Sequence, residues 1–328
     1  MTKKRVLSGV RATGGLHLGN YLGAVSGMLA LQEKPEYETF YMIADLHSIN
    51  TRYDPRTFQK KVKGVILDYL SAGLDPSKST IFIQSHIPEH IELSYLFSTT
   101  LTVARMLHLP TYKDKIKEDP ENANMAMFYY PVLMAADILI YKANAVPVGD
   151  DQTPHLEVAR EVARKMNEKY KTRFPEPVHF KTQGHIVPSL IGKGKMSKSV
   201  EGSYINLTDS FQEIKEKLAK VPTDSGRGTQ LPKEGGVNTL LTFVELFLGK
   251  DRRQEHEEIY LGTGIRYQKL KDELAEAIYK QLEPIQKRRR ELEKDKFYVE
   301  NLVKEGAIKA REIASQTLRE VKEKMGLL

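Results

Sequence analysis

The stretch RVLSGVRATGGLHLGNYLGAVSGML, residues 5–29, passes from a short β-rich run through a glycine-rich turn into a helical run. Residues 5–8 are typical of a strand, and apolar residues at positions 22, 25 and 29 recur on one face of a helix that begins near Leu18. A strand that leads through such a turn into a helix is a typical first unit of a parallel sheet. The stretch therefore predicts an α/β fold.

The alternation of strand and helix continues downstream of this stretch. Residues 39–44 and 79–84 are predicted to form the second and third strands, and residues 145–149 a later strand. Between the second and third strands, Pro55 opens a helix and Gly73 lies just past its end. These elements indicate a Rossmann-like, doubly wound parallel sheet.

The character of the chain changes after about residue 205, where the strands stop. The later segments have helical periodicity and are in part very polar; they are residues 209–221, 238–247, 270–294 and 307–324. The Gly-, Ser- and Lys-rich stretch 192–202 is the natural joint. We therefore predict a catalytic α/β domain in residues 1–200 and a C-terminal helical domain in residues 201–328.

The chain is ordinary in composition for a soluble globular enzyme. It has 328 residues, of which 40% are hydrophobic and 28% charged, and no apolar run approaches the length that spans a bilayer. The basic start is followed by an apolar run far too short for a signal peptide. We expect a cytoplasmic protein with no membrane partner.

Cysteine is absent, which excludes disulfides, thiolate nucleophiles and cysteine-held metal. The nine histidines show no H-x-x-H or H-E-x-x-H pairing, so we expect no protein-bound metal. The net charge of +7 suits an anionic partner, and the positive excess lies in the first 200 residues, with 26 Lys and Arg against 20 Asp and Glu.

The turn Thr13-Gly14-Gly15-Leu16-His17-Leu18-Gly19-Asn20 is the first candidate site. Glycines let the backbone approach a polyphosphate, and the helix that follows presents its positive end to the anion. His17 and Asn20 lie three residues apart, close enough to point toward one phosphate. The alternative is a simple turn with a helix cap.

The segment Lys195-Met196-Ser197-Lys198-Ser199 is the second candidate. Two lysines and two hydroxyl groups in five residues can neutralise a leaving pyrophosphate and donate hydrogen bonds to it. A solvated basic loop is the alternative for this segment on its own.

Together the two segments resemble the signature sequences H-[IL]-G-[HN] and K-M-S-K-S of class I aminoacyl-tRNA synthetases. The second signature is intact, and the first ends in Asn20, a variant similar to the tryptophan and tyrosine branch. The resemblance implies His17, Asn20, Lys195 and Lys198 as catalytic residues that align ATP and stabilise its charge.

A third segment, residues 130–141 (YPVLMAADILIY), is an apolar helical run with one carboxylate, Asp137. A buried carboxylate needs a donor, and a neighbouring Arg or Lys is one possibility. The run also resembles bacterial-type tryptophanyl-tRNA synthetases, in which this aspartate accepts the indole N–H. Tyrosine enzymes differ here, so the resemblance favours tryptophan over tyrosine.

The same resemblance extends to V-P-V-G-D-D-Q at residues 146–152. It implies a tryptophan pocket formed by Asp137, Gln152, His47, Tyr130, Met134, Val146, Val148 and Leu7, in which Gln152 holds the amino group. It implies an ATP site formed by Arg11, Ala12, Thr13, Gly19, Asn20, Gly149, Asp150, Asp151, Val187, Lys195, Met196, Ser197, Lys198 and Ser199. From the residues alone, Asp151 could be a helix cap, and Tyr130, Met134, Val146 and Val148 could be core.

Function and partners follow from the resemblance. It implies a tryptophan–tRNA ligase that uses ATP with Mg²⁺, binds tRNA(Trp) through the helical domain and forms a homodimer. One departure is Arg11-Ala12-Thr13-Gly14, where the family often has Q-P-S-G. This departure leaves open a second, auxiliary tryptophan enzyme, and an inactive synthetase-like module is a further alternative.

Overall fold

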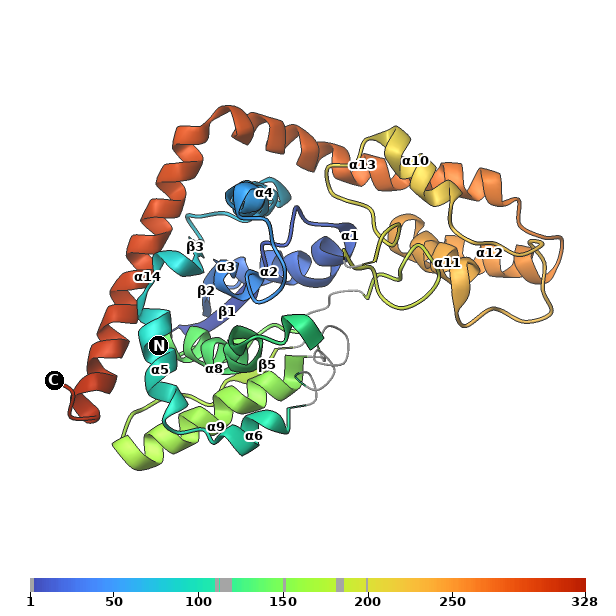
Figure 1. The fold of residues 1–328 in the computed structure, drawn as a ribbon. Helices are drawn as coiled ribbons and strands as arrows, with labels where there is room; N and C mark the ends of the chain where they lie inside the picture. Colours follow the sequence, from blue (N-terminus) through green and yellow to red (C-terminus); the bar gives the residue numbers. More distant parts are fainter. Residues whose placement is uncertain (1–2, 110–111, 113–119, 150–151, 181–185, 199) are drawn as a thin grey trace.

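The computed structural model describes residues 3–109, 112, 120–149, 152–180, 186–198 and 200–328 (Figure 1). At its centre lies a sheet of parallel strands in the order β3-β2-β1-β4-β5. The strands are β1 (Lys4–Val10), β2 (Tyr37–Ile43), β3 (Ser79–Ile83), β4 (Ala145–Val146) and β5 (Val178–His179). Because β2 and β3 extend from one side of β1 and β4 and β5 from the other, the sheet is doubly wound, which confirms the predicted fold.

Helices cover both faces of the sheet (Figure 1). One face is covered by α1 (Leu18–Asn20), the π-helical turn η1 (Tyr21–Val25), α2 (Ser26–Gln32) and α4 (Pro55–Ala72). The other face is covered by α5 (Glu89–Ser98), α6 (Val103–Leu107), α8 (Met125–Ile140) and α9 (Thr153–Tyr170). Short turns follow the strands: α3 (Asp45–Ser48) after β2 and η2 (Gln84–His86) after β3, while η3 (Pro120–Asn122) precedes α8.

Strand β2 contributes to two separate cores. Phe40 and Met42 pack with the helices of one face, and Tyr41 and Ile43 pack with those of the other. Successive side chains of a strand point to opposite faces, so a strand covered on both sides is an unbroken apolar run. This arrangement explains the apolar run FYMIA at residues 40–44.

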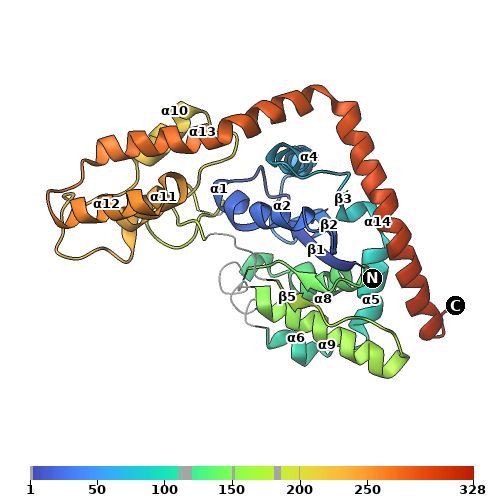
Figure 2. The same cartoon turned by 180° about the vertical axis from the view of Figure 1, so that it is seen from behind.

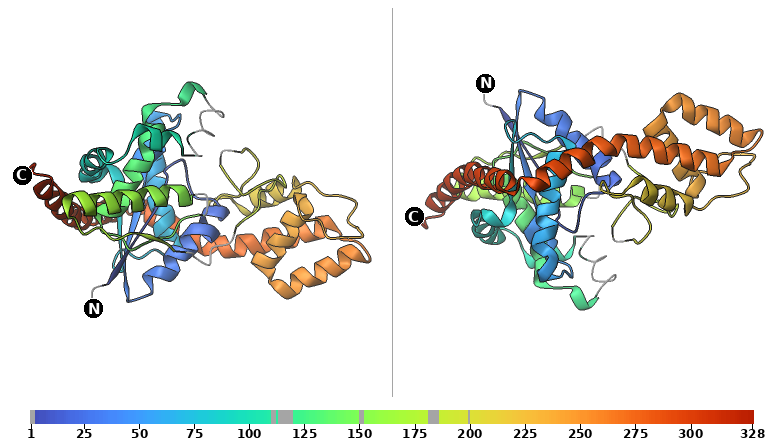
Figure 3. Two further views of the ribbon diagram at one scale, coloured as in Figure 1. Left: turned by 90° about the horizontal axis from the view of Figure 1, so that it is seen from below. Right: turned by 90° about the horizontal axis from the view of Figure 1, so that it is seen from above.

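The C-terminal part is helical, as predicted. It contains α10 (Phe211–Ala219), α11 (Gly235–Leu248), α12 (Lys250–Leu261), α13 (Tyr267–Lys294) and α14 (Lys296–Lys324). Figure 3 shows α10, α11 and α12 set to one side of the sheet, with α13 leading back to it. Helix α12 was not among the predicted helices, because only His256 and Tyr260 of its residues are buried and they form no apolar stripe.

Helix α14 lies against β3, the strand at one edge of the sheet (Figure 2). A Cβ atom added at Gly306 would come within 1.9 Å of the carbonyl oxygen of Ile81. The absence of a side chain at Gly306 therefore lets the helix backbone touch the strand backbone. The last helix of the chain is thus part of the sheet domain's packing.

No helix in the described ranges is long and apolar enough to cross a membrane. In the same ranges, no group of three or more histidine and acidic side chains could hold a metal ion.

Candidate active site

The predicted site residues gather at the carboxyl ends of the strands. The glycine-rich turn follows β1, His47 follows β2 and Gly149 follows β4. Strands β1 and β4 are neighbours, although their connections run in opposite directions along the sheet. In doubly wound sheets, ligands bind at this switch point.

The first signature segment is joined through the backbone to residues 205–207, which follow the second signature segment in the chain. Leu18 N donates to Ile205 O at 2.9 Å, and Leu207 N donates to Leu16 O at 3.0 Å. Gly14 has a φ of 139°, and a Cβ there would lie 3.1 Å from the Lys198 ammonium nitrogen. The glycine-rich turn therefore faces the lysine segment at Gly14. A side chain at position 14 would crowd the Lys198 ammonium group.

His17 is the N-cap of α1. Its Nδ1 accepts from Asn20 N at 3.3 Å, and the Asn20 side-chain oxygen accepts from His17 N at 3.2 Å. Burial lowers the pKa of His17 to about 4, and the charge of Lys198 acts in the same direction. At neutral pH the ring is thus uncharged with its proton on Nε2, so it is a hydrogen-bond donor suited to a phosphate oxygen.

The lysine segment is held by a small hairpin. The backbone N of Met196 donates to Val187 O at 2.9 Å and closes this hairpin. The side chains of Val187 and Met196 are both buried in the core. Burial lowers the pKa of Lys198, while the charges of Asp68 and Asp209 oppose that shift. Lys195 is exposed.

Asp68 supports the glycine-rich turn from α4. Its buried carboxylate accepts from Leu16 N at 2.6 Å and forms an ion pair with Arg289 of α13. Burial raises the pKa of Asp68 to about 6, although the charge of Arg289 lowers it. This link was missed in the sequence, where Arg289 belongs to the basic run 287–290.

Asp137 is buried on α8 and is surrounded by donors. His47 Nε2 lies 2.7 Å from Oδ2, His90 Nδ1 lies 2.5 Å from Oδ1, and Gln84 Nε2 lies 2.8 and 3.0 Å from the two oxygens. Burial acts to raise the pKa of Asp137, but the hydrogen bonds from His47 and His90 outweigh it and hold the pKa at about 2. The carboxylate is therefore ionised, and its partners are imidazole and amide groups instead of Arg or Lys.

The other residues implied for the tryptophan pocket lie in the same core. Leu7 and Val146 are buried in it, and Met134 and Val148 are half-buried against it. Tyr130 is half-buried, with its ring centroid 6.2 Å from that of His47 and its hydroxyl 2.5 Å from His155 Nε2. The structure thus places these residues in or against one core, with Tyr130 next to His47, which contacts Asp137.

The residues implied for ATP are distributed around the switch point. Arg11, Thr13 and Gly149 are exposed, and Ala12 is buried with its N donating to the Ser48 hydroxyl at 2.7 Å. Gln152, which is implied for the tryptophan pocket, is half-buried before α9, and its N donates to Gly149 O at 2.9 Å. Gly19 packs against the His17 ring and Met196, and the Ser197 N donates to the Ser203 hydroxyl at 3.3 Å. Asp150, Asp151 and Ser199 lie outside the described residues.

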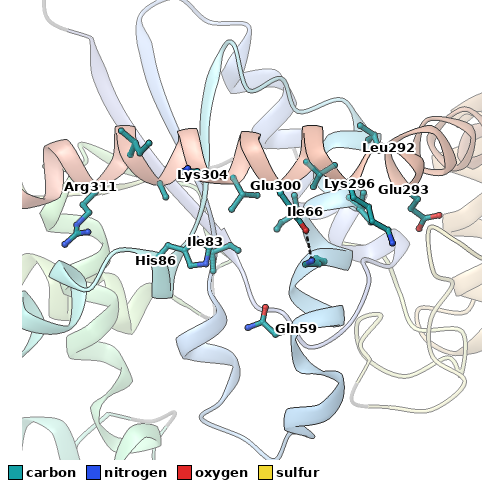
Figure 4. A pocket seen from close by; sticks show the side chains of 16 residues that line it. Gln59, Ile66, Ile83, His86, Leu292, Glu293, Lys296, Glu300, Lys304 and Arg311 are labelled. Carbon is teal, nitrogen blue, oxygen red and sulfur yellow. Dashed lines mark hydrogen bonds and ion pairs between the residues drawn. The ribbon is translucent and has the colours of Figure 1, made fainter.

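A separate groove of about 730 Å³ lies between α4 and α14 (Figure 4). Gln59 and Ile66 line it from α4, and Lys296 and Lys304 line it from α14. Lys63 and Glu300 form an ion pair of 3.1 Å across it. None of its lining residues belongs to the predicted site.

A doubly wound sheet with a glycine-rich turn, a donating histidine and two lysines at its switch point is typical of enzymes that act on nucleoside phosphates. The chain belongs to the family of tRNA synthetases class I (W and Y), whose family model matches residues 2–283.

Relatives and solved structures agree with this family. The chain is 40% identical over 328 residues to a tryptophan–tRNA ligase of Fusobacterium nucleatum, with 99% of this chain and 98% of the relative covered. The tryptophanyl-tRNA synthetase of Campylobacter jejuni, complexed with ADP and tryptophan, superimposes with a TM-score of 0.86 at 31% identity, covering 98% of this chain and 100% of that one. The enzyme from Mycoplasma pneumoniae gives 0.85 at 30% identity, with coverage of 99% and 98%.

Proposed function

We propose that the protein activates L-tryptophan with ATP and transfers it to tRNA(Trp). The central observation is Asp137, an ionised carboxylate inside an apolar and aromatic region. An ionised carboxylate buried in such a region is a hydrogen-bond acceptor for an aromatic N–H. Relatives about 40% identical over almost the whole chain are tryptophan–tRNA ligases, which supports this substrate.

Activation requires alignment and charge stabilisation without a side-chain base. The tryptophan carboxylate oxygen attacks the α-phosphorus of ATP, and the bond to the β-phosphate oxygen breaks as pyrophosphate leaves. His17 Nε2–H, Asn20, Lys195 and Lys198 are assigned to the phosphate oxygens, where charge develops. In the second step the terminal ribose hydroxyl of tRNA attacks the carbonyl carbon of the adenylate, and AMP leaves.

Mg²⁺ is assigned to ATP and not to the protein. The described residues contain no cluster of acidic and histidine side chains that could hold it. Mg²⁺ characteristically binds phosphate oxygens and keeps several waters, and it would neutralise charge on the phosphates.

We assign residues 1–200 to catalysis, residues 201–328 to tRNA anticodon binding, and the active form to a cytoplasmic homodimer. Helices α10, α11 and α12 lie to one side of the sheet (Figure 3), which supports a separate role for this helical region. Large apolar side chains are exposed on neighbouring helices that could form the dimer contact; they are Ile91, Tyr95, Val103, Leu107 and Met125.

ATP–pyrophosphate exchange with purified protein tests the proposal. Exchange with L-tryptophan and not with L-tyrosine is expected. Exchange with tyrosine alone would overturn the substrate, and exchange with neither would favour a module without activity.

Asp137→Asn tests the substrate contact at nearly constant shape. It is expected to lower kcat/KM for tryptophan by about 10²- to 10³-fold, because it removes the charge that Gln84, His90, His47 and the indole N–H share. The KM for ATP should stay within about twofold, since phosphate binding uses other residues. The exposed Asp251→Asn on α12 is the matched control. Unchanged tryptophan kinetics in Asp137→Asn would contradict the assignment.

A further inference from the structure

The donors around Asp137 differ in their access to solvent. The side chains of Gln84 and His90 are fully buried, whereas that of His47 is 11% exposed. Gln84 follows β3 and His90 lies on α5, so two separate elements hold the carboxylate from its enclosed side. Neither side chain belongs to the set that the sequence implies for the pocket.

Hydrogen-bond chemistry fixes the direction of the His90 contacts. An ionised carboxylate only accepts, so His90 Nδ1 must donate to Asp137. His90 Nε2 lies 2.7 Å from the Tyr141 hydroxyl. Burial and the charge of Asp137 raise the pKa of Tyr141, so this hydroxyl keeps its proton and donates to Nε2. The order of donation is Tyr141 to His90 to Asp137.

The amide of Gln84 is committed to the same carboxylate. Its Nε2 donates to both oxygens of Asp137, and its buried Oε1 has no partner among the described residues. An unsatisfied buried acceptor costs about 1–3 kcal/mol. The reverse orientation would place an amide oxygen against the carboxylate, so the observed one is favoured despite this cost.

We propose that Gln84 and His90, the latter oriented by Tyr141, are positioning residues that keep Asp137 ionised and aimed for recognition of the substrate's aromatic N–H. Without these donors a carboxyl group at this depth would take up a proton. A protonated carboxyl is a weaker acceptor for an N–H donor, so selection for indole would fall. This inference rests on the proposed function.

The variant Gln84→Glu distinguishes a positioning role of Gln84 from a purely structural one, because only the positioning role predicts a new pH dependence of tryptophan binding. The side chain has nearly the same shape, but two carboxylates at this distance share one proton. At low pH the protonated Glu donates as the amide does, and at high pH it repels Asp137. The dissociation constant of tryptophan should therefore rise with pH in this variant, by about 10- to 100-fold between its protonated and ionised limits.

Binding can be measured directly, because the chain contains no tryptophan and indole fluorescence excited at the red edge reports the ligand. The exposed Gln212→Glu on α10 is the matched control and should follow the wild type at every pH. A Gln84→Glu variant that folds and binds tryptophan with the pH dependence of the wild type would overturn the inference.

Two His90 variants keep the inference testable if Gln84→Glu fails to fold. His90→Asn retains a donor near the Nδ1 position, whereas His90→Leu removes it. Tryptophan affinity is expected to be recovered in part by Asn and lost by about 10-fold or more in Leu, with the KM for ATP unchanged in both. Equal affinities in the two variants would contradict the positioning role. A wild-type protein without exchange activity on tryptophan would instead refute the proposed function itself.

Discussion

At the residue scale, burial on one side of the site and hydrogen bonds that outweigh burial on the other assign different protonation states to the two sides. His17 on the phosphate side is held uncharged, and Asp137 on the amino-acid side is held ionised. A neutral donor near phosphate leaves the positive charge to the lysines. An ionised acceptor in the pocket gives the N–H of the substrate a strong partner. In the proposed mechanism, the lysines thus neutralise the phosphate charge, and Asp137 recognises the amino-acid side chain.

The lowered pKa of His17 gives a stability prediction with a definite sign. The unfolded chain takes up a proton near pH 6.5, whereas the folded chain takes it up only near pH 4. The contribution of His17 to stability is therefore lost as the pH falls from 6.5 toward 4. His17→Gln lacks this proton, so its Tm should fall less than that of the wild type between pH 7 and pH 5. Parallel Tm curves would show that His17 titrates normally.

At the element scale, the turn after β1 depends on a glycine, because a residue with a side chain would not fit its backbone conformation and close contacts. Gly14 combines a φ of 139° with close approach of Lys198. Gly64, in the middle of α4, has nothing within 4 Å of an added Cβ. Gly14 is therefore required by the local geometry, whereas Gly64 is not.

Gly14→Ala is expected to lower kcat for activation by about 10-fold or more, because a Cβ strains the turn and displaces Lys198 from the phosphate side. Tryptophan binding should remain, since the pocket around Asp137 is untouched. Gly64→Ala is the matched control and should raise stability by about 0.5–1 kcal/mol at unchanged kcat. Pyrophosphate exchange and thermal unfolding distinguish the two variants, and wild-type kcat in Gly14→Ala would argue against the role of the turn.

Much of the fold could be predicted from local patterns, but the buried contacts could not. The strand at residues 79–84 is correct to within one position, and that position is Gln84, which lies in the turn η2. Gln84 and His90 lie 53 and 47 residues from Asp137, and Asp68 lies 52 from Leu16. Periodicity gives the face on which a residue lies and no information on its distant partner. A polar residue at the carboxyl end of a buried strand was the available signal for Gln84.

At the scale of the whole molecule, the sheet domain and the helical region share one core. Residues of α4 and of α10, α11 and α13 belong to the same buried cluster. The Arg289–Asp68 ion pair lies at this junction and reaches the phosphate turn through Leu16 N. The position of α13 is thereby coupled to the site by direct contacts.

Arg289→Met is expected to destabilise the protein by about 3–5 kcal/mol, because it leaves the buried Asp68 without its partner. The double variant Asp68→Asn with Arg289→Met should recover part of this loss, since no charge then remains buried. Urea unfolding of the four proteins in a double-mutant cycle gives the coupling free energy. Strictly additive losses would show that the pair contributes nothing beyond its separate side chains.

The contact of Gly306 with Ile81 also has a consequence for folding during translation. Strand β3 emerges from the ribosome more than 200 residues before the helix that covers it. During that interval its outer edge has unpaired backbone groups, which invite pairing with another nascent chain. Translation that stops short of α14 would leave this edge exposed permanently. Helix α14 therefore covers an edge that would otherwise favour aggregation.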